Sequence, residues 1–289
     1  MQKQHYIGVG LVCIVLIGVV GFWMTSGDEN KTLQFSFDFS EDDAGWEHLF
    51  VDYPVGEEED YELEGGRMLL PDTLGHEYGY YLSGENHSDD LSMLIKRSFG
   101  PEDGLDPNTT YRVKFFIEIA SNAPSGCVGV GGAPGESVYF KAGAAVAEPT
   151  AIVEGAGGNE YYRLSIDKGN QASGGNDSVV LGHIGTSNND CHNWEFLFKT
   201  FQSTEGDSDA TSDQNMSPDE ADDMTKETLD GSVNGSDDSN LPPQNPSTIM
   251  EVTTDDSGQL WIFMGTDSGF EATSSIYINE IQITFEPVE

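Results

Sequence analysis

Four carboxylates near the two ends of the chain have the types and positions that metal binding needs. Asp38, Glu41 and Asp43 follow the first alternating apolar stretch, and Glu280 lies in the last one. Hard oxygen ligands of this kind suit Ca²⁺, and the four would meet if the first and last strands paired. A solvated polar loop is the competing interpretation. We therefore expect either a structural Ca²⁺ or no cofactor.

Two tyrosines have the spacing of a binding platform. Tyr78 and Tyr80 alternate within the stretch 78–84, so they share one face of a strand. Exposed aromatic rings bind sugars and other flat ligands, because they combine an apolar body with a polar tip. Packing in the core is the competing interpretation. Tyr78 and Tyr80 are the ligand-binding residues that the sequence predicts.

Two carboxylates in apolar runs raise the question of hydrolysis. Glu118 and Glu195 lie in strand-like segments where a carboxylate is out of place. Glycoside hydrolysis needs two carboxylates held across a cleft. The chain has neither the E-x-D-x-x-E pattern of β-sandwich glucanases nor a G-x-S-x-G nucleophile elbow. We expect a protein that is not an enzyme, with a glycoside hydrolase as the second alternative.

The glycine-rich stretch SGCVGVGGAPGES, residues 125–137, is not a phosphate loop. Gly129 and Gly131 fit a G-x-G-x-x-G pattern, but Pro134 stands at the third glycine position. The next segment has a strand pattern, so no helix N-terminus follows to face a phosphate. This excludes a nucleotide, and the glycines are expected to shape a strand and turn.

Cys127 and Cys191 are the cysteines outside the N-terminal segment. A pair of this kind in an exported protein usually forms a disulfide. Two buried free thiols are the alternative.

The N-terminal segment predicts a membrane anchor. Residues 6–24 carry no charge and are long enough to cross a bilayer. Lys3 precedes them and acidic residues follow, so the bulk of the chain is expected outside the cytoplasm. We assign residues 1–29 to a signal anchor at the cell membrane. Cleavage near Ser26 or Gly27 is the alternative.

The charge is strongly negative throughout. The chain has 51 acidic and 12 basic residues, a net charge of -39. Nucleic acids and anionic lipids are excluded as partners, because both are bound through Lys and Arg. Acid spread over a folded domain indicates a halophilic source, with an acidic secreted protein from an ordinary habitat as the alternative.

Apolar residues outside the anchor alternate with a period of two, which predicts an antiparallel all-β sandwich or barrel. The parity changes within the last stretch, and a bulge near Asn279–Glu280 would explain it. Residues 203–245 are acidic and almost free of apolar residues, so we expect a disordered insertion. The expected strands are 33–39, 46–53, 78–84, 91–99, 110–120, 137–143, 160–167, 178–184, 193–201, 259–265 and 274–286. One extracytoplasmic domain, residues 30–202 with 246–289, contains them.

The two ends of this domain carry a resemblance. FSFDFSEDDAGW and GTDSGFEATSSIYINEIQITF resemble extracellular jelly-roll modules of the carbohydrate-binding type, in which first and last strands are neighbours. IYINEI departs from their usual IYIDNI-like strand at Asn279 and Glu280. IASNAPSGCVGVGGAPGESVYFKAG looks like the middle of uncharacterised exported bacterial and archaeal all-β proteins.

Together these features predict a membrane-anchored, jelly-roll-like β-sandwich that binds a glycan or another cell-surface ligand. The alternative is a structural cell-surface protein without a small ligand.

Overall fold

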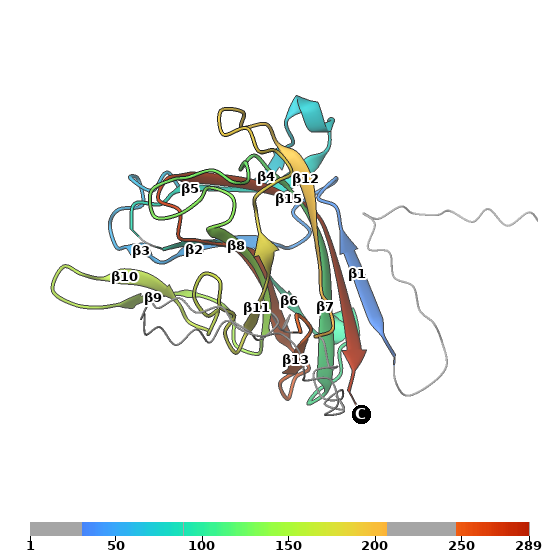
Figure 1. Cartoon of the computed structure of the whole chain (residues 1–289). Helices are drawn as coiled ribbons and strands as arrows, with labels where there is room; N and C mark the ends of the chain where they lie inside the picture. Colours follow the sequence, from blue (N-terminus) through green and yellow to red (C-terminus); the bar gives the residue numbers. More distant parts are fainter. Residues whose placement is uncertain (1–30, 89, 207–246, 289) are drawn as a thin grey trace, which may run out of the picture.

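The computed structural model describes residues 31–88, 90–206 and 247–288. These residues form three antiparallel sheets (Figure 1). Their helical content is two short 3₁₀ turns, η1 (Asp72–Leu74) and η2 (Pro101–Asp103). Within the described ranges, no helix has the length and apolarity to span a membrane. The expected anchor, residues 1–29, lies outside them, as does most of the expected insertion 203–245.

The seven-stranded sheet contains the first and last described strands. β15 pairs with β7 along one edge; on the other edge it pairs first with β5 and then with β1. β4 extends the sheet beyond β5, while β12 and β13 share the far edge of β7. The strands are β1 (Leu33–Phe37), β4 (Glu64–Leu69), β5 (Tyr78–Glu85), β7 (Thr110–Ser121), β12 (Leu197–Gln202), β13 (Met250–Thr253) and β15 (Thr273–Pro287).

The five-stranded sheet packs against it to form a β-sandwich. Its order is β11-β8-β14-β6-β2. The alternation seen in the sequence places one face of each sheet in a shared core, where Phe99 and Phe285 lie with ring centroids 5.4 Å apart. The strands are β2 (Glu47–Val51), β6 (Leu91–Phe99), β8 (Val138–Ala145), β11 (Ser178–His183) and β14 (Leu260–Ser268).

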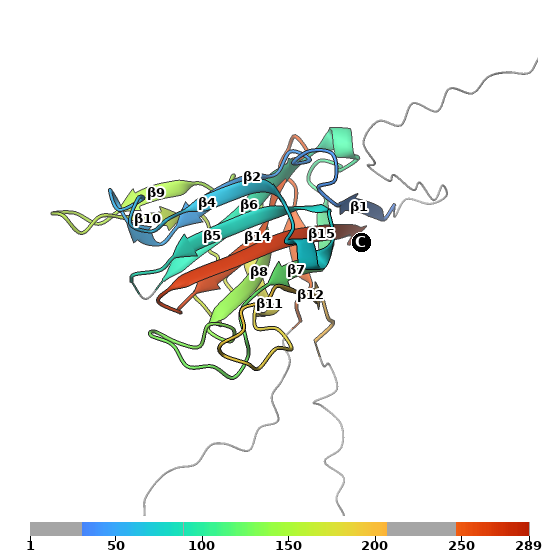
Figure 2. The ribbon, with the colours of Figure 1, turned by 90° about the horizontal axis from the view of Figure 1, so that it is seen from above.

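A small third sheet projects from one side of the sandwich (Figures 1 and 2). It consists of β3 (Tyr53–Pro54), β9 (Ala151–Glu154) and β10 (Tyr161–Leu164). We call residues 151–177, which contain β9, β10 and the loop to β11, the arm. Leu164 and Ile166 of the arm pack on Leu94 and Phe263, on the outer face of the five-stranded sheet.

The chain enters and leaves the undescribed stretch 207–246 at one place. Thr204 N donates to Thr248 Oγ1 over 2.7 Å, and β12 and β13 both pair with β7. The segments on either side of this stretch therefore belong to one sheet. Residues 203–206, which the sequence assigns to the insertion, are ordered against β7, since Ser203 N donates to Phe115 O.

The structure agrees with the expected all-β sandwich, the pairing of first and last strands, and the bulge. The β15 register shifts between Ile278 and Glu280. The sequence missed β9, because its side chains are exposed on both faces and show no alternation. It also missed the glycine-containing β4. The stretch 125–137 is a loop and not the expected strand and turn.

Candidate functional site

The bulge in β15 opens a pocket between two strands of the seven-stranded sheet. β5 pairs with β15 as far as Ile278, and β1 pairs with it from Ile281 onward. The residues between them, Asn279 and Glu280, line a pocket of about 420 Å³. The other lining residues are Asp38, Ser40, His76, Glu77 and Tyr78.

Three residues singled out in the sequence therefore meet here: Tyr78, Asp38 and Glu280. The ring of Tyr78 is not an open platform, because the Arg67 guanidinium lies 3.6 Å from its centroid. Arg67 Nε also donates to the carbonyl of Phe39 over 2.6 Å, which fixes its position. Stacking of a ligand on this face of Tyr78 would have to displace the guanidinium.

Tyr80, the second expected platform residue, is a core residue. It is 3 % exposed, and its ring lies 5.6 Å from that of Phe39. Its hydroxyl lies 3.2 Å from His48 Nδ1. Burial, followed by the nearby charge of Asp43, raises the pKa of Tyr80 to about 12. The expectation that Tyr80 contacts a ligand is wrong, because its side chain points into the sandwich.

The expected calcium ligands do not assemble as one group. Asp38 and Glu280 reach the bulge pocket, but Glu41 and Asp43 do not line it. Asp38 instead accepts bonds from the backbone N and hydroxyl of Ser40. Among the described residues, the carboxylates that lie within 4.8 Å of one another as a group of three are elsewhere in the fold.

An aromatic row crosses the outer face of the seven-stranded sheet. Cross-strand pairing aligns one residue from each of five strands: Phe198 (β12), Ala120 (β7), Tyr277 (β15), Tyr81 (β5) and Gly66 (β4). The rings of Tyr81 and Tyr277 lie 4.7 Å apart, and Phe198 is 42 % exposed. We refer to these five residues as the aromatic row.

Polar groups flank the aromatic row on both sides. On one side, the hydroxyls of Ser83 and Ser275 are 2.8 Å apart. On the other, Asn279 Nδ2 donates to Glu118 Oε1 over 2.8 Å. Apolar rings bordered by fixed hydroxyl, amide and carboxylate groups are the usual components of a site that binds a sugar or a similar ligand.

The expected Cys127–Cys191 disulfide is present, with its Cα atoms 5.7 Å apart. It fixes a loop that brings two further aromatic residues to the edge of the row. Trp194 Nε1 donates to Cys191 O over 3.2 Å, and this side chain is 43 % exposed. The Phe196 ring lies 5.3 Å from that of Tyr277. The disulfide thus positions one end of the aromatic surface.

Sequence reasoning missed the aromatic row for an identifiable reason. It considered only the strand face shared by Tyr78 and Tyr80, whereas Tyr81, the next residue, lies on the opposite face with the row. Tyr277 and Phe198 have the parity opposite to their buried neighbours, which was the available signal. Cross-strand register, which aligns them, is not visible in a single strand.

The residues considered for hydrolysis do not face each other across a cleft. Glu118 is half-buried on a sheet face, and its partner in the neighbouring strand is Glu280. Glu195 is exposed in the loop before β12.

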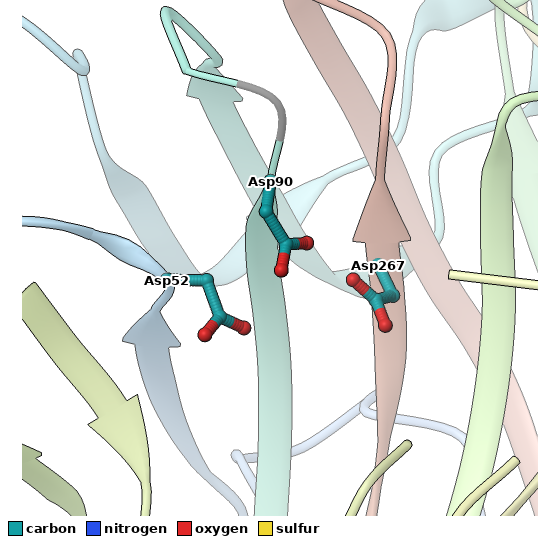
Figure 3. Close-up of side chains that lie close together, drawn as sticks. All are labelled: Asp52, Asp90 and Asp267. Atoms are coloured by element: carbon teal, nitrogen blue, oxygen red, sulfur yellow. The ribbon is translucent and has the colours of Figure 1, made fainter. Parts of the chain in front are cut away.

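A second cluster lies under the arm and contains three carboxylates. Asp52 follows β2, Asp90 precedes β6 and Asp267 lies in β14, and their carboxylates converge (Figure 3). Two lysines pair with two of these carboxylates. Lys168 Nζ is 3.0 Å from Asp52 and 2.9 Å from Asp267, and Lys141 Nζ is 2.7 Å from Asp267. The cluster is therefore an ion-pair network whose cations are Lys141, Lys168 and Arg163.

The fold and the aromatic row together define an all-β sandwich protein with a partly exposed aromatic surface. No protein-family model matches the chain, and no curated protein matches it. Among solved structures, it is similar to a carbohydrate-binding module, TmCBM27, described as recognising mannan. The identity is 9 %, the match covers 91 % of this chain and 97 % of the other, and the TM-score is 0.30. A similarity at this level does not transfer a ligand.

Proposed function

We propose that the protein is a jelly-roll-type binding module and that the aromatic row binds a glycan chain. The observation that supports this most directly is the alignment of Phe198, Tyr277 and Tyr81 across one face of a single sheet. A structural surface protein would not need this arrangement. We further propose, from the uncharged residues 6–24 of the sequence alone, that the module lies outside the cytoplasm on a membrane anchor.

The dimensions of the row fit an extended ligand. Neighbouring strands lie about 4.8 Å apart, so the step from β12 to β5 spans roughly 14 Å. At the end of the row, a Cβ added to Gly66 would have no heavy atom within 4 Å, so the surface there is open. A chain of sugar rings could therefore contact several side chains while its hydroxyls reached the flanking polar groups.

The charges around the row favour a neutral glycan over an anionic one. Glu64, Glu118 and Glu280 lie on or beside this face. The basic residues of β7 on this face, Arg112 and Lys114, lie toward the other end of the strand and pair with acidic side chains. A uronate or sulfated polymer would meet uncompensated carboxylates, which repel it, especially at low salt.

Binding of polysaccharides to the full-length protein tests this proposal. Affinity electrophoresis with neutral and uronate-containing polymers should show retardation by a neutral polymer, with and without Ca²⁺. Tyr277→Ala should weaken it by about tenfold, since loss of one stacked ring typically costs about 1–2 kcal/mol. Tyr139→Ala, a half-buried tyrosine of the five-stranded sheet, is the matched control and should bind normally. If no polymer binds under any condition, the structural alternative is favoured; if both variants bind equally, the row is not the site.

A further inference from the structure

The ion-pair network under the arm joins two parts of the fold. Arg163 and Lys168 belong to the arm, whereas the three carboxylates belong to the five-stranded sheet, in β14 and next to the ends of β2 and β6. Arg163 Nη1 lies 2.8 Å from Asp52 Oδ1, and Lys168 bridges Asp52 and Asp267. These ion pairs and the small apolar contact around Phe263 attach the arm to the outer face of that sheet. The pairing of β10 with β3 and the hydrogen bond from Asp52 N to Tyr162 O hold it beside β2 as well.

Asp90 is the carboxylate that the arm neutralises least. Its closest arm cation is Arg163, at 4.0 Å, whereas Asp52 and Asp267 each have an ammonium group within 3.0 Å. Its Oδ1 is buried without a hydrogen-bond partner among the groups of the described residues. In Figure 3 its carboxylate lies beside that of Asp267. The charged groups around it are Asp52, Asp267, Lys141, Arg163 and Lys168, and Glu154 and Asp167 line the same pocket.

A proton on Asp90 accounts for this environment. Burial, followed by the charge of Asp267, raises the pKa of Asp90 to about 8, while the two lysines hold the pKa of Asp267 below its usual range despite its burial. One proton shared by the pair, with Asp90 as donor and Asp267 as acceptor, fits both the opposite directions of the two pKa shifts and the unpartnered buried Oδ1 of Asp90. It also removes the repulsion between two adjacent carboxylates.

The arm helps to create the burial that raises this pKa. Asp52 and Asp90 form one side of a pocket of about 390 Å³, and arm residues between Arg163 and Asn170 form the other. If the arm moved away, water would reach Asp90 and its pKa would fall toward the ordinary carboxyl range. Closure of the arm must therefore take up a proton.

We propose that the arm is a proton-controlled cover of the five-stranded sheet, held closed while Asp90 and Asp267 share a proton and released when that proton is lost. The direction follows from linkage. Because the pKa of Asp90 is raised in the closed state, its proton favours closure most near the ordinary carboxyl range; at still lower pH, protonation of Asp267, whose pKa is lowered in the closed state, opposes closure. Closure weakens as the pH rises toward about 8, by up to tenfold per pH unit for one proton, and the effect levels off above that value. Release would expose Leu94 and Phe263, which the arm covers.

Hydrogen–deuterium exchange of the full-length protein, corrected for the intrinsic pH dependence, tests the cover. Exchange in β9 and β10 should rise several-fold per pH unit between about pH 5 and pH 8, while exchange in β7 stays constant. Asp90→Asn should abolish the rise in the arm. Glu154→Gln removes an exposed carboxylate that lines the same pocket, and it should leave the rise intact. An arm with constant protection in the wild type, or a rise that persists in Asp90→Asn, would overturn the proposal.

The wild-type protein supplies a second test that does not depend on the folding of the Asp90 variant. Its infrared spectrum in D₂O should contain the band of a protonated carboxyl at about pH 6, where ordinary carboxyl groups are ionised. The band should disappear on titration through about pH 8. Absence of this band at about pH 6 would refute the shared proton. A band that titrates while arm protection stays constant would refute its control of the arm.

Discussion

Removal of the Cys127–Cys191 disulfide should destabilise the fold and weaken binding at the aromatic row. The two cysteines are 64 residues apart in sequence. For a closed loop of that length, the chain-entropy model gives a stabilisation of about 4 kcal/mol, because the bond restricts the unfolded chain. The native geometry should change little when Cys127→Ala and Cys191→Ala are combined. Most of that free energy should therefore be lost.

Guanidinium unfolding of the full-length protein measures the loss as a lower midpoint at unchanged slope. Reduced wild-type protein should unfold at nearly the same midpoint as the double variant, which controls for packing changes at Cys127. A loss below about 1 kcal/mol would refute the reasoning, since it would mean that the unfolded chain is not restricted by the bond.

The same double variant distinguishes an effect of the disulfide on the stability of the fold from its effect on the position of the aromatic loop. The disulfide fixes the loop that carries Trp194 and Phe196 beside Tyr277. In the absence of denaturant, and at a temperature at which the variant is fully folded, glycan affinity should still fall several-fold. The conformational entropy lost in ordering the loop then opposes binding. Unchanged affinity would show that this loop is not part of the surface.

Two substitutions away from the row should reduce stability for different reasons. Lys141→Ala removes a fully buried ammonium that lies 2.7 Å from Asp267. Thermal unfolding should therefore show that the free energy of unfolding falls by about 3–5 kcal/mol. A decrease below about 1 kcal/mol would show that Lys168 alone compensates the charge of Asp267. Gly143→Ala would place a Cβ 2.3 Å from the Asp177 carbonyl oxygen and 2.2 Å from the Phe263 ring. The same measurement should therefore show that the free energy of unfolding falls by about 1–3 kcal/mol. An unchanged free energy of unfolding would mean that β8 can shift freely to admit the methyl group.

The sequence predicted the strands well where one face is apolar and the other is polar. β6 begins and ends at the expected residues, Leu91 and Phe99, because turn residues bound an apolar run. Alternation does not say which face meets the other sheet when both carry tyrosines. Tyr80 and Tyr81 are the same residue type, and only the position of the second sheet buries the first and leaves the other half-buried on the outer face.

The buried charge network could not be predicted in the same way. Its members come from segments distant in sequence, and no fixed spacing links them. A partial signal existed in Lys141 and Asp267, each of which interrupts an apolar strand. Such an interruption indicates a buried charge that needs a partner, but it does not identify that partner. The strand register identifies the partner. Asp267 pairs with Tyr139 and Lys141 pairs with Gly265 on the adjacent strand, so Lys141 and Asp267 lie diagonally opposite each other, two positions apart.

The network also shows where an acidic chain places three of its few basic residues. Only 12 of its residues are Lys or Arg, against 51 Asp or Glu, yet Lys141 and Lys168 are buried and Arg163 is half-buried in one cluster. Burial of these cations leaves the net charge unchanged but keeps their positive charge away from the surface, so the surface itself is more acidic. Cations inside also neutralise carboxylates that water cannot reach, and salt screens them little. The same chain can thus keep an acidic exterior, which salt screens, and an attachment of the arm that responds to protons.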